Sequence, residues 1–164
     1  MEIQFKYKEK PTEFIFGIVL IDLDLCPIHL GFFYENELFE LTTKGLQIYP
    51  KEKFLNWIRI KKKKACYLPF DNLNVLNRET IENIFNSFNL NLTGITCLDP
   101  LKKILSVCID NSIDDCKTIF DVLKKIKEFN ANQNFYYLGN ELLVSFQLKE
   151  YTREEVYYYI NEIK

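Results

Sequence analysis

Three residues of this chain could together form a thiol nucleophile, its base and a carboxylate that orients the base. His29 is the only histidine, Glu40 lies in the next apolar segment, and Cys97 directly precedes a stretch with helical spacing. A cysteine attacks a carbonyl as its thiolate, which both an imidazole and a helix N-terminus stabilise. A carboxylate beside the imidazole orients the ring and favours its charged form. The residue types therefore point to nucleophilic catalysis, and any imidazole-dependent step must use His29.

Each of these residues also has a purely structural interpretation. A cysteine is often a small buried apolar side chain, a lone strand histidine is often only hydrogen-bonded, and Glu40 could be an exposed edge residue. Glu40 favours the catalytic interpretation over the structural one. It interrupts an apolar strand, in which an unpaired carboxylate would be costly to bury. Cys116 also lies near a predicted helix start, but the adjacent Asp114 and Asp115 oppose a thiolate there. The remaining cysteines are expected to pack: Cys26, Cys66 and Cys108.

The elements that position these residues begin with a series of strands. Runs of β-branched and aromatic residues predict strands at 14–21, 28–34, 37–42 and 46–49. Glu35–Asn36 is expected to turn the second strand back onto the third. His29 lies six residues before Glu35 and Glu40 four after Asn36, so their approach is expected to need a small shift or a bulge in the pairing.

Helices and a short C-terminal unit follow. Apolar spacing predicts helices at 51–58, 78–88, 97–105 and 114–128, the last with Ser112 as its N-cap, and a strand at 65–70. Strands at 135–138 and 141–148, turned by Gly139–Asn140, precede a helix that begins with the capping box Thr152–Glu155. This order predicts an α+β fold in one domain, with a core at 12–128 and a C-terminal β-β-α extension at 129–164.

Composition narrows the classes of function. The chain has 164 residues, a formal net charge of −2 and five cysteines without a Cys-x-x-Cys pair. Neither nucleic acid nor a zinc or other cofactor is therefore expected as a partner. The one basic block, Lys61–Lys64, is interpreted as a solvated turn, with a phosphate or lipid-headgroup contact as the alternative. The longest apolar stretch, 14–25, contains two aspartates and is too short to span a bilayer, and no signal peptide is evident, so a soluble cytoplasmic protein is expected.

Segments 28–34, 38–55 and 97–105 resemble the circularly permuted papain-like cysteine hydrolases. This family includes relatives of lecithin retinol acyltransferase and many bacterial, phage and poxvirus proteins. Its members have a histidine followed by an apolar residue and a glycine, then a strand, turn, strand and helix, and finally a nucleophile helix. The permutation places the histidine before the cysteine, as in this chain. Ile28 and Thr96 depart from the residues that commonly precede the histidine and the cysteine.

The resemblance implies a curled antiparallel sheet packed against the cysteine helix. It also implies that Cys97 is the nucleophile, His29 the general base and Glu40 the group that orients it. The reaction would be attack on an amide, ester or thioester of a small-molecule, lipid or peptide substrate, followed by hydrolysis or acyl transfer. The backbone N–H of Cys97 would supply one oxyanion donor.

Two alternatives remain open from the sequence. The first is an inactive member of the same fold that acts as a binding or assembly module. An aromatic content of 15% and the run Tyr157–Tyr159 favour it, and they would suit a homo-oligomer formed through the C-terminal region. The second is an unrelated α+β regulator or nucleic-acid binder, which only Lys61–Lys64 supports.

Overall fold

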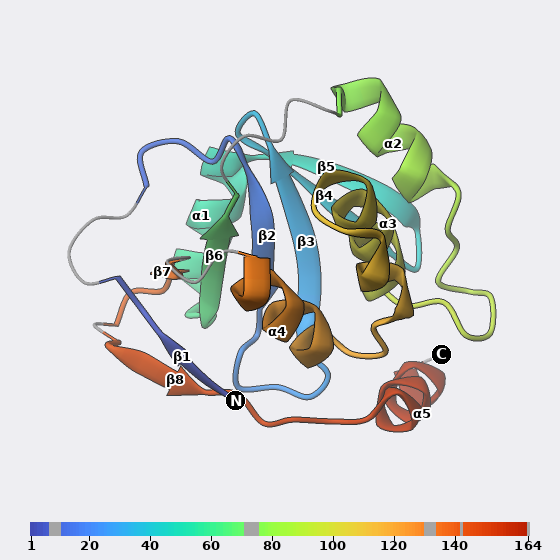
Figure 1. Ribbon diagram of the computed structural model, residues 1–164. Coiled ribbons are helices and arrows are strands. Elements are labelled where there is room, and N and C mark those ends of the chain that lie inside the picture. The colour runs from blue at the N-terminus through green and yellow to red at the C-terminus, as the bar shows by residue number, and fades with distance from the viewer. Residues whose placement is uncertain (7–10, 71–75, 130–133, 142, 164) are drawn as a thin grey trace.

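The chain forms an α+β structure built around an antiparallel sheet with helices on both faces (Figure 1). This computed structural model describes residues 1–6, 11–70, 76–129, 134–141 and 143–163. The strand order is β5-β4-β3-β2-β6-β7. These strands are β2 (Phe16–Ile21), β3 (His29–Tyr34), β4 (Glu37–Thr42), β5 (Gly45–Pro50), β6 (Ala65–Pro69) and β7 (Tyr136–Tyr137). The predicted fold class is confirmed at this level.

Helices follow the predicted positions along most of the chain. Figure 1 shows α3 and α4 on the near side of the sheet and α1 behind it. The helices are α1 (Lys51–Lys61), α2 (Arg78–Asn86), α3 (Leu98–Cys108), α4 (Ile119–Phe129) and α5 (Arg153–Ile163).

The β3–β4 hairpin sets the relation between His29 and Glu40. Glu35 and Asn36 have φ values of 45° and 65°, the left-handed conformation that a two-residue hairpin turn requires. Pairing then runs without interruption from Tyr34 opposite Glu37 to Gly31 opposite Glu40. The expected shift or bulge is wrong, because Glu40 lies one diagonal step from His29 on the same side of the sheet, and a diagonal pair is within reach of long side chains.

Alternation along the strands divides the apolar side chains between two cores. Leu30 and Phe32 of β3 lie in the larger core, which α2, α3 and α4 cover. Phe33 of β3 and Leu38 of β4 lie in the smaller core against α1. Both faces of the sheet are thus buried, which explains why the strands are apolar almost without alternation.

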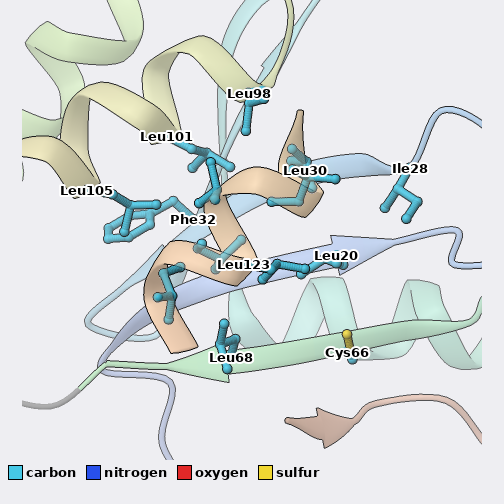
Figure 2. Close-up of a cluster of buried hydrophobic side chains, with 14 of the residues drawn as sticks. Leu20, Ile28, Leu30, Phe32, Cys66, Leu68, Leu98, Leu101, Leu105 and Leu123 are labelled. Atoms are coloured by element: carbon cyan, nitrogen blue, oxygen red, sulfur yellow. The ribbon is translucent and has the colours of Figure 1, made fainter. Parts of the chain in front are cut away.

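The larger core fixes the position of the cysteine helix. Figure 2 shows Leu98, Leu101 and Leu105 of α3 lying over Leu30 and Phe32 of β3. All five side chains are at most 8% exposed. The helix that begins at Cys97 is therefore fixed directly against the strand that begins at His29.

The predicted helix at 114–128 is wrong at its start. A short 3-10 helix spans Asn111–Asp115, and α4 begins only at Ile119. Thr118 and Asp121 form a reciprocal cap: Asp121 Oδ2 accepts from the Thr118 backbone N–H at 2.9 Å, and Thr118 Oγ1 accepts from the Asp121 N–H at 3.3 Å. Ser112 is not the N-cap of α4. The Thr118–Asp121 box supplies partners for N–H groups at the helix start, so the helix begins there.

The predicted C-terminal hairpin is also wrong, although the order strand, strand, helix is correct. β7 pairs with β6 in the main sheet, whereas β8 (Ser145–Gln147) pairs with β1 (Glu2–Gln4) in a separate two-stranded sheet. Pairing of the N-terminal strand is a long-range contact that no local pattern indicates. The sequence also predicts a polar loop at 71–77. Residues 71–75 of that loop and residue 142 of the strand predicted at 141–148 lie outside the described residues.

Lys62–Lys64 of the basic block form the predicted turn between α1 and β6, whereas Lys61 is the last residue of α1. Lys63 Nζ lies 2.7 Å from an Asp22 carboxylate oxygen, and Lys64 Nζ lies 3.7 Å from one of Asp24. Two of the four lysines are therefore neutralised by the loop between β2 and β3. Across the described ranges, no helix has the length and apolar character that a bilayer crossing requires.

Candidate active site

Cys97 lies at the start of α3 because Thr96 and Asp99 cap that helix. Asp99 Oδ2 accepts from the Thr96 backbone N–H at 2.7 Å, and Thr96 Oγ1 accepts from the Leu98 N–H at 3.2 Å. Pro100 in the first turn does not interrupt the helix, since its missing N–H has no intrahelical partner there. Thr-x-x-Asp is a readable capping signal that the sequence analysis missed. The cap leaves Cys97 at the positive end of the helix dipole.

The structure brings together all three residues predicted for the site. Cys97 and His29 line the same cavity, and Cys97 is one of the groups that act on the charge of the imidazole. His29 Nε2 lies 3.8 Å from Glu40 Oε1, an ion-pair distance rather than a direct hydrogen bond. Glu40 is 13% exposed at its side chain and His29 35%. The imidazole thus lies between a thiol and a mostly buried carboxylate.

Gly31 makes room for this arrangement. It lies between His29 and Phe33 on β3 and directly opposite Glu40. A Cβ at this position would come within 2.7 Å of Leu38 Cδ1. Because no side chain separates them, the diagonal from His29 to Glu40 is open.

The charges around His29 favour its protonated form. Partial burial lowers the pKa of the imidazole, but its interactions with Cys97 and Glu40 outweigh burial and raise the pKa to about 10. The ring is therefore an imidazolium at neutral pH. A positive charge therefore lies at the cavity that Cys97 lines.

His29 and Glu40 lie on one side of the sheet, whereas the helix that Cys97 precedes packs on the other. Strand alternation places His29 and Glu40 on the side of Phe33 and Leu38, which α1 covers, whereas α3 packs on the other side. His29 is the first residue of β3, at the end of the sheet. Contact across the sheet is therefore made at its end, where Cys97 begins α3.

A cavity of about 350 Å³ opens at Cys97 and His29. Much of its wall is apolar, and it includes Leu98 of α3 and Ile119 of α4. The C-terminal segment supplies another part of the wall, which the sequence analysis did not predict: Tyr151, Arg153 and Val156. The C-terminal extension is therefore part of this site.

Helix α5 is attached to the loop that leads to Cys97. Tyr157 donates its hydroxyl to the Gly94 carbonyl at 2.9 Å, and Arg153 Nη2 donates to the same oxygen at 3.4 Å. Gly94 has a φ of 85°, a conformation in which a side chain is strained. Tyr158, by contrast, is 63% exposed, so the tyrosine run faces more than one side.

The other four cysteines are in environments that disfavour a thiolate. Burial raises the pKa of Cys66, raises that of Cys108 to about 11, and also raises that of Cys116, where Asp121 and Asp115 add to the effect. Cys26 lines the same cavity as Cys97, and burial raises its pKa as well. All five cysteines are free of disulfides.

Glu40 also borders a second cavity, of about 270 Å³, on the α1 side. Its other lining residues are Tyr49, Lys53, Phe54 and Trp57. Burial first, and then the charge of Glu40, raise the pKa of Tyr49. The Glu40 carboxylate thus acts on residues of both strands that pair with β4, His29 of β3 and Tyr49 of β5.

Comparison with protein-family models, curated proteins and solved structures finds no match to this chain. Within the part of the chain that the structure describes, no group of three or more His, Cys, Asp or Glu side chains is arranged to hold a metal ion.

Proposed function

We propose that this protein is a cysteine-dependent hydrolase or acyltransferase of the permuted papain-like type. One observation carries the proposal: Cys97 at a helix N-terminus lines the same cavity as the only histidine, and Glu40 lies 3.8 Å from that histidine. Nucleophile, base and orienting group thus follow one another in the order that acyl transfer needs. An antiparallel sheet packed on the cysteine helix agrees with the family that the sequence resembles.

The reaction would proceed in two steps. The Cys97 thiolate attacks the carbonyl carbon, a C–S bond forms, and the carbonyl π electrons move to the oxygen. Collapse of this intermediate breaks the bond to the leaving group, which takes a proton from the His29 imidazolium. Neutral His29 then removes a proton from water or from an acceptor, which attacks the acyl-enzyme and releases Cys97.

Glu40 would hold the imidazole in its productive orientation. Since Nε2 faces the carboxylate, Nδ1 is the ring nitrogen left for the thiol and the substrate. At 3.8 Å the mostly buried carboxylate still stabilises the charge of the imidazolium. This role needs no proton transfer to Glu40.

The wall of the cavity indicates the kind of acyl group. Leu98, Ile119 and Val156 contribute apolar surface beside the thiol. Burial of an apolar group against such a wall contributes binding free energy in proportion to its area. An acyl chain or an apolar peptide side chain fits this chemistry.

Selective alkylation tests the proposal. We expect iodoacetamide to label Cys97 faster than any other cysteine at neutral pH, because only Cys97 has an imidazolium as its neighbour. Peptide mapping by mass spectrometry gives the rate at each site. Cys26 is a matched internal control, since it lines the same cavity but its raised pKa keeps it a thiol. Equal, slow labelling of Cys97 and Cys26 would reject the enzyme and leave a binding module with this fold.

The protonation state of His29 gives a second prediction. Its pKa of about 10 means that the ring is protonated below that pH and neutral above it. Removing the Glu40 charge removes one cause of the upward shift, so Glu40→Gln should move the titration to lower pH. NMR of the imidazole Cε1–H measures this without ambiguity, since the chain has one histidine.

Glu37→Gln is the matched control for this titration. Glu37 lies on the same strand, but it pairs with Arg78 on the surface. We expect this variant to leave the His29 midpoint unchanged. A wild-type midpoint near the ordinary value of about 6.5 would contradict the proposed ion pair.

A further inference from the structure

Tyr151 is fixed at the cavity that holds Cys97. Its ring packs edge-on against Phe120 of α4, with the centroids 4.9 Å apart and the planes at 70°. Tyr151 is only 8% exposed, and it lines the cavity together with Cys97 and His29. A ring buried in this way has little freedom to move its hydroxyl group.

Tyr151 borders this cavity together with the start of the strand that carries His29. Ile28, His29, Cys97 and Tyr151 all line it. An interaction with the Ile28 main chain lowers the pKa of the phenol. A tyrosine hydroxyl carries one proton that it can donate, so Tyr151 can supply a hydrogen-bond donor to a group bound in the cavity.

The hydroxyl also stays protonated at neutral pH. Burial first, and then the charge of Cys97, raise the pKa of Tyr151 and outweigh the opposing effect of the Ile28 main chain. Tyr151 and Cys97 line the same cavity, so a group bound at the sulfur lies in the space that the tyrosine borders. A neutral donor of this kind can bind a developing negative charge without giving up its proton.

We propose that Tyr151 is a catalytic residue that donates a hydrogen bond to the oxyanion of the tetrahedral intermediate on Cys97. The inference rests on the proposed function. When the thiolate attacks, the C–S bond forms and the carbonyl electron pair moves to the oxygen, which then accepts the Tyr151 O–H. No proton is transferred to the oxyanion. The negative charge returns to the carbonyl bond when the leaving group departs with the His29 proton.

Two reagents separate this role from a structural one. Acylation of Cys97 by p-nitrophenyl butyrate passes through an oxyanion, whereas alkylation by iodoacetamide is a direct displacement that forms none. We expect Tyr151→Phe to slow the Cys97-dependent release of nitrophenol by roughly 100-fold and to leave alkylation of Cys97 within about twofold of the wild type. The substitution keeps the ring against Phe120 and removes one oxygen atom.

Tyr137→Phe is the matched control. Tyr137 is 9% exposed, close to the value for Tyr151, but it lies in β7 and does not line the cavity. We expect this variant to keep both rates. Loss of a buried tyrosine hydroxyl is thereby separated from loss of this particular hydroxyl.

The outcomes are distinguishable. If Tyr151→Phe slows acylation alone, the inference stands. If both rates are unchanged, or both fall together, Tyr151 is not an oxyanion donor, although the proposed function still holds. If the wild type shows neither selective alkylation of Cys97 nor Cys97-dependent nitrophenol release, the proposed function fails and the inference fails with it.

Discussion

Cys97→Ser is expected to abolish formation of the acyl-enzyme. A serine hydroxyl is a far weaker nucleophile than a thiolate, and the imidazolium of His29 cannot remove its proton. We expect the rate of nitrophenol release from p-nitrophenyl butyrate to fall by at least about 1000-fold. Intact-mass spectrometry should show an added butyryl group on the wild type and none on the variant.

The fold should tolerate this substitution. Thr96 and Asp99 cap α3, so Cys97 contributes no side-chain cap. The midpoint of thermal unfolding should therefore stay close to the wild-type value. Cys26→Ser is the control, because Cys26 lines the same cavity and should be dispensable for acylation. An acyl group found on Cys26, or on the Cys97→Ser variant, would show that the nucleophile is misassigned.

His29→Gln is expected to have the second largest effect. It removes both the cation that stabilises the thiolate and the acid that protonates the leaving group, so acylation should slow by roughly 100- to 10,000-fold. The preference of iodoacetamide for Cys97 should disappear in the same variant. Stopped-flow acylation and site-resolved alkylation measure the two effects separately.

The same substitution should also destabilise the fold, because it leaves Glu40 without its partner. Glu40 is 13% exposed at its side chain, and an unpaired charge at such a site costs on the order of 1–3 kcal/mol. The double variant His29→Gln/Glu40→Gln should regain part of this stability in urea unfolding without regaining activity. Full activity of His29→Gln would show that the imidazole takes no part in the mechanism.

Local patterns were sufficient to predict most of the main sheet. The turn at Glu35–Asn36 and the runs of leucine and aromatic residues on either side place β3 and β4 within a residue of their observed ends. The Thr152–Glu155 capping box is confirmed: Glu155 Oε2 accepts from the Thr152 backbone N–H at 2.7 Å. Such elements depend on contacts between residues close in the chain, which a sequence pattern records directly.

Helix starts were predicted less well where two signals competed. Ser112 and the aspartates after it favoured an early start for α4, but the box at Thr118–Asp121 sets the observed start. The box at Thr96–Asp99 was equally readable and would have placed Cys97 more firmly at the start of α3. A capping box is identified by two residues three positions apart whose side chains bond to each other's backbone N–H groups. Composition alone does not distinguish such a box from a polar loop.

The sequence by itself determined which chemistry is possible. One histidine, a carboxylate in an apolar strand and a cysteine before a helix restrict the candidate nucleophile, base and orienting group to Cys97, His29 and Glu40. Only the tertiary structure decided that these groups meet. Strand alternation assigns His29 and α3 to opposite sides of the sheet, and the two come together only because the first residue of β3 lies where α3 begins. The same holds for Tyr151, which reaches the cavity through packing on Phe120. Periodicity reports the side of an element on which a residue lies, whereas contacts between distant segments depend on how whole elements pack.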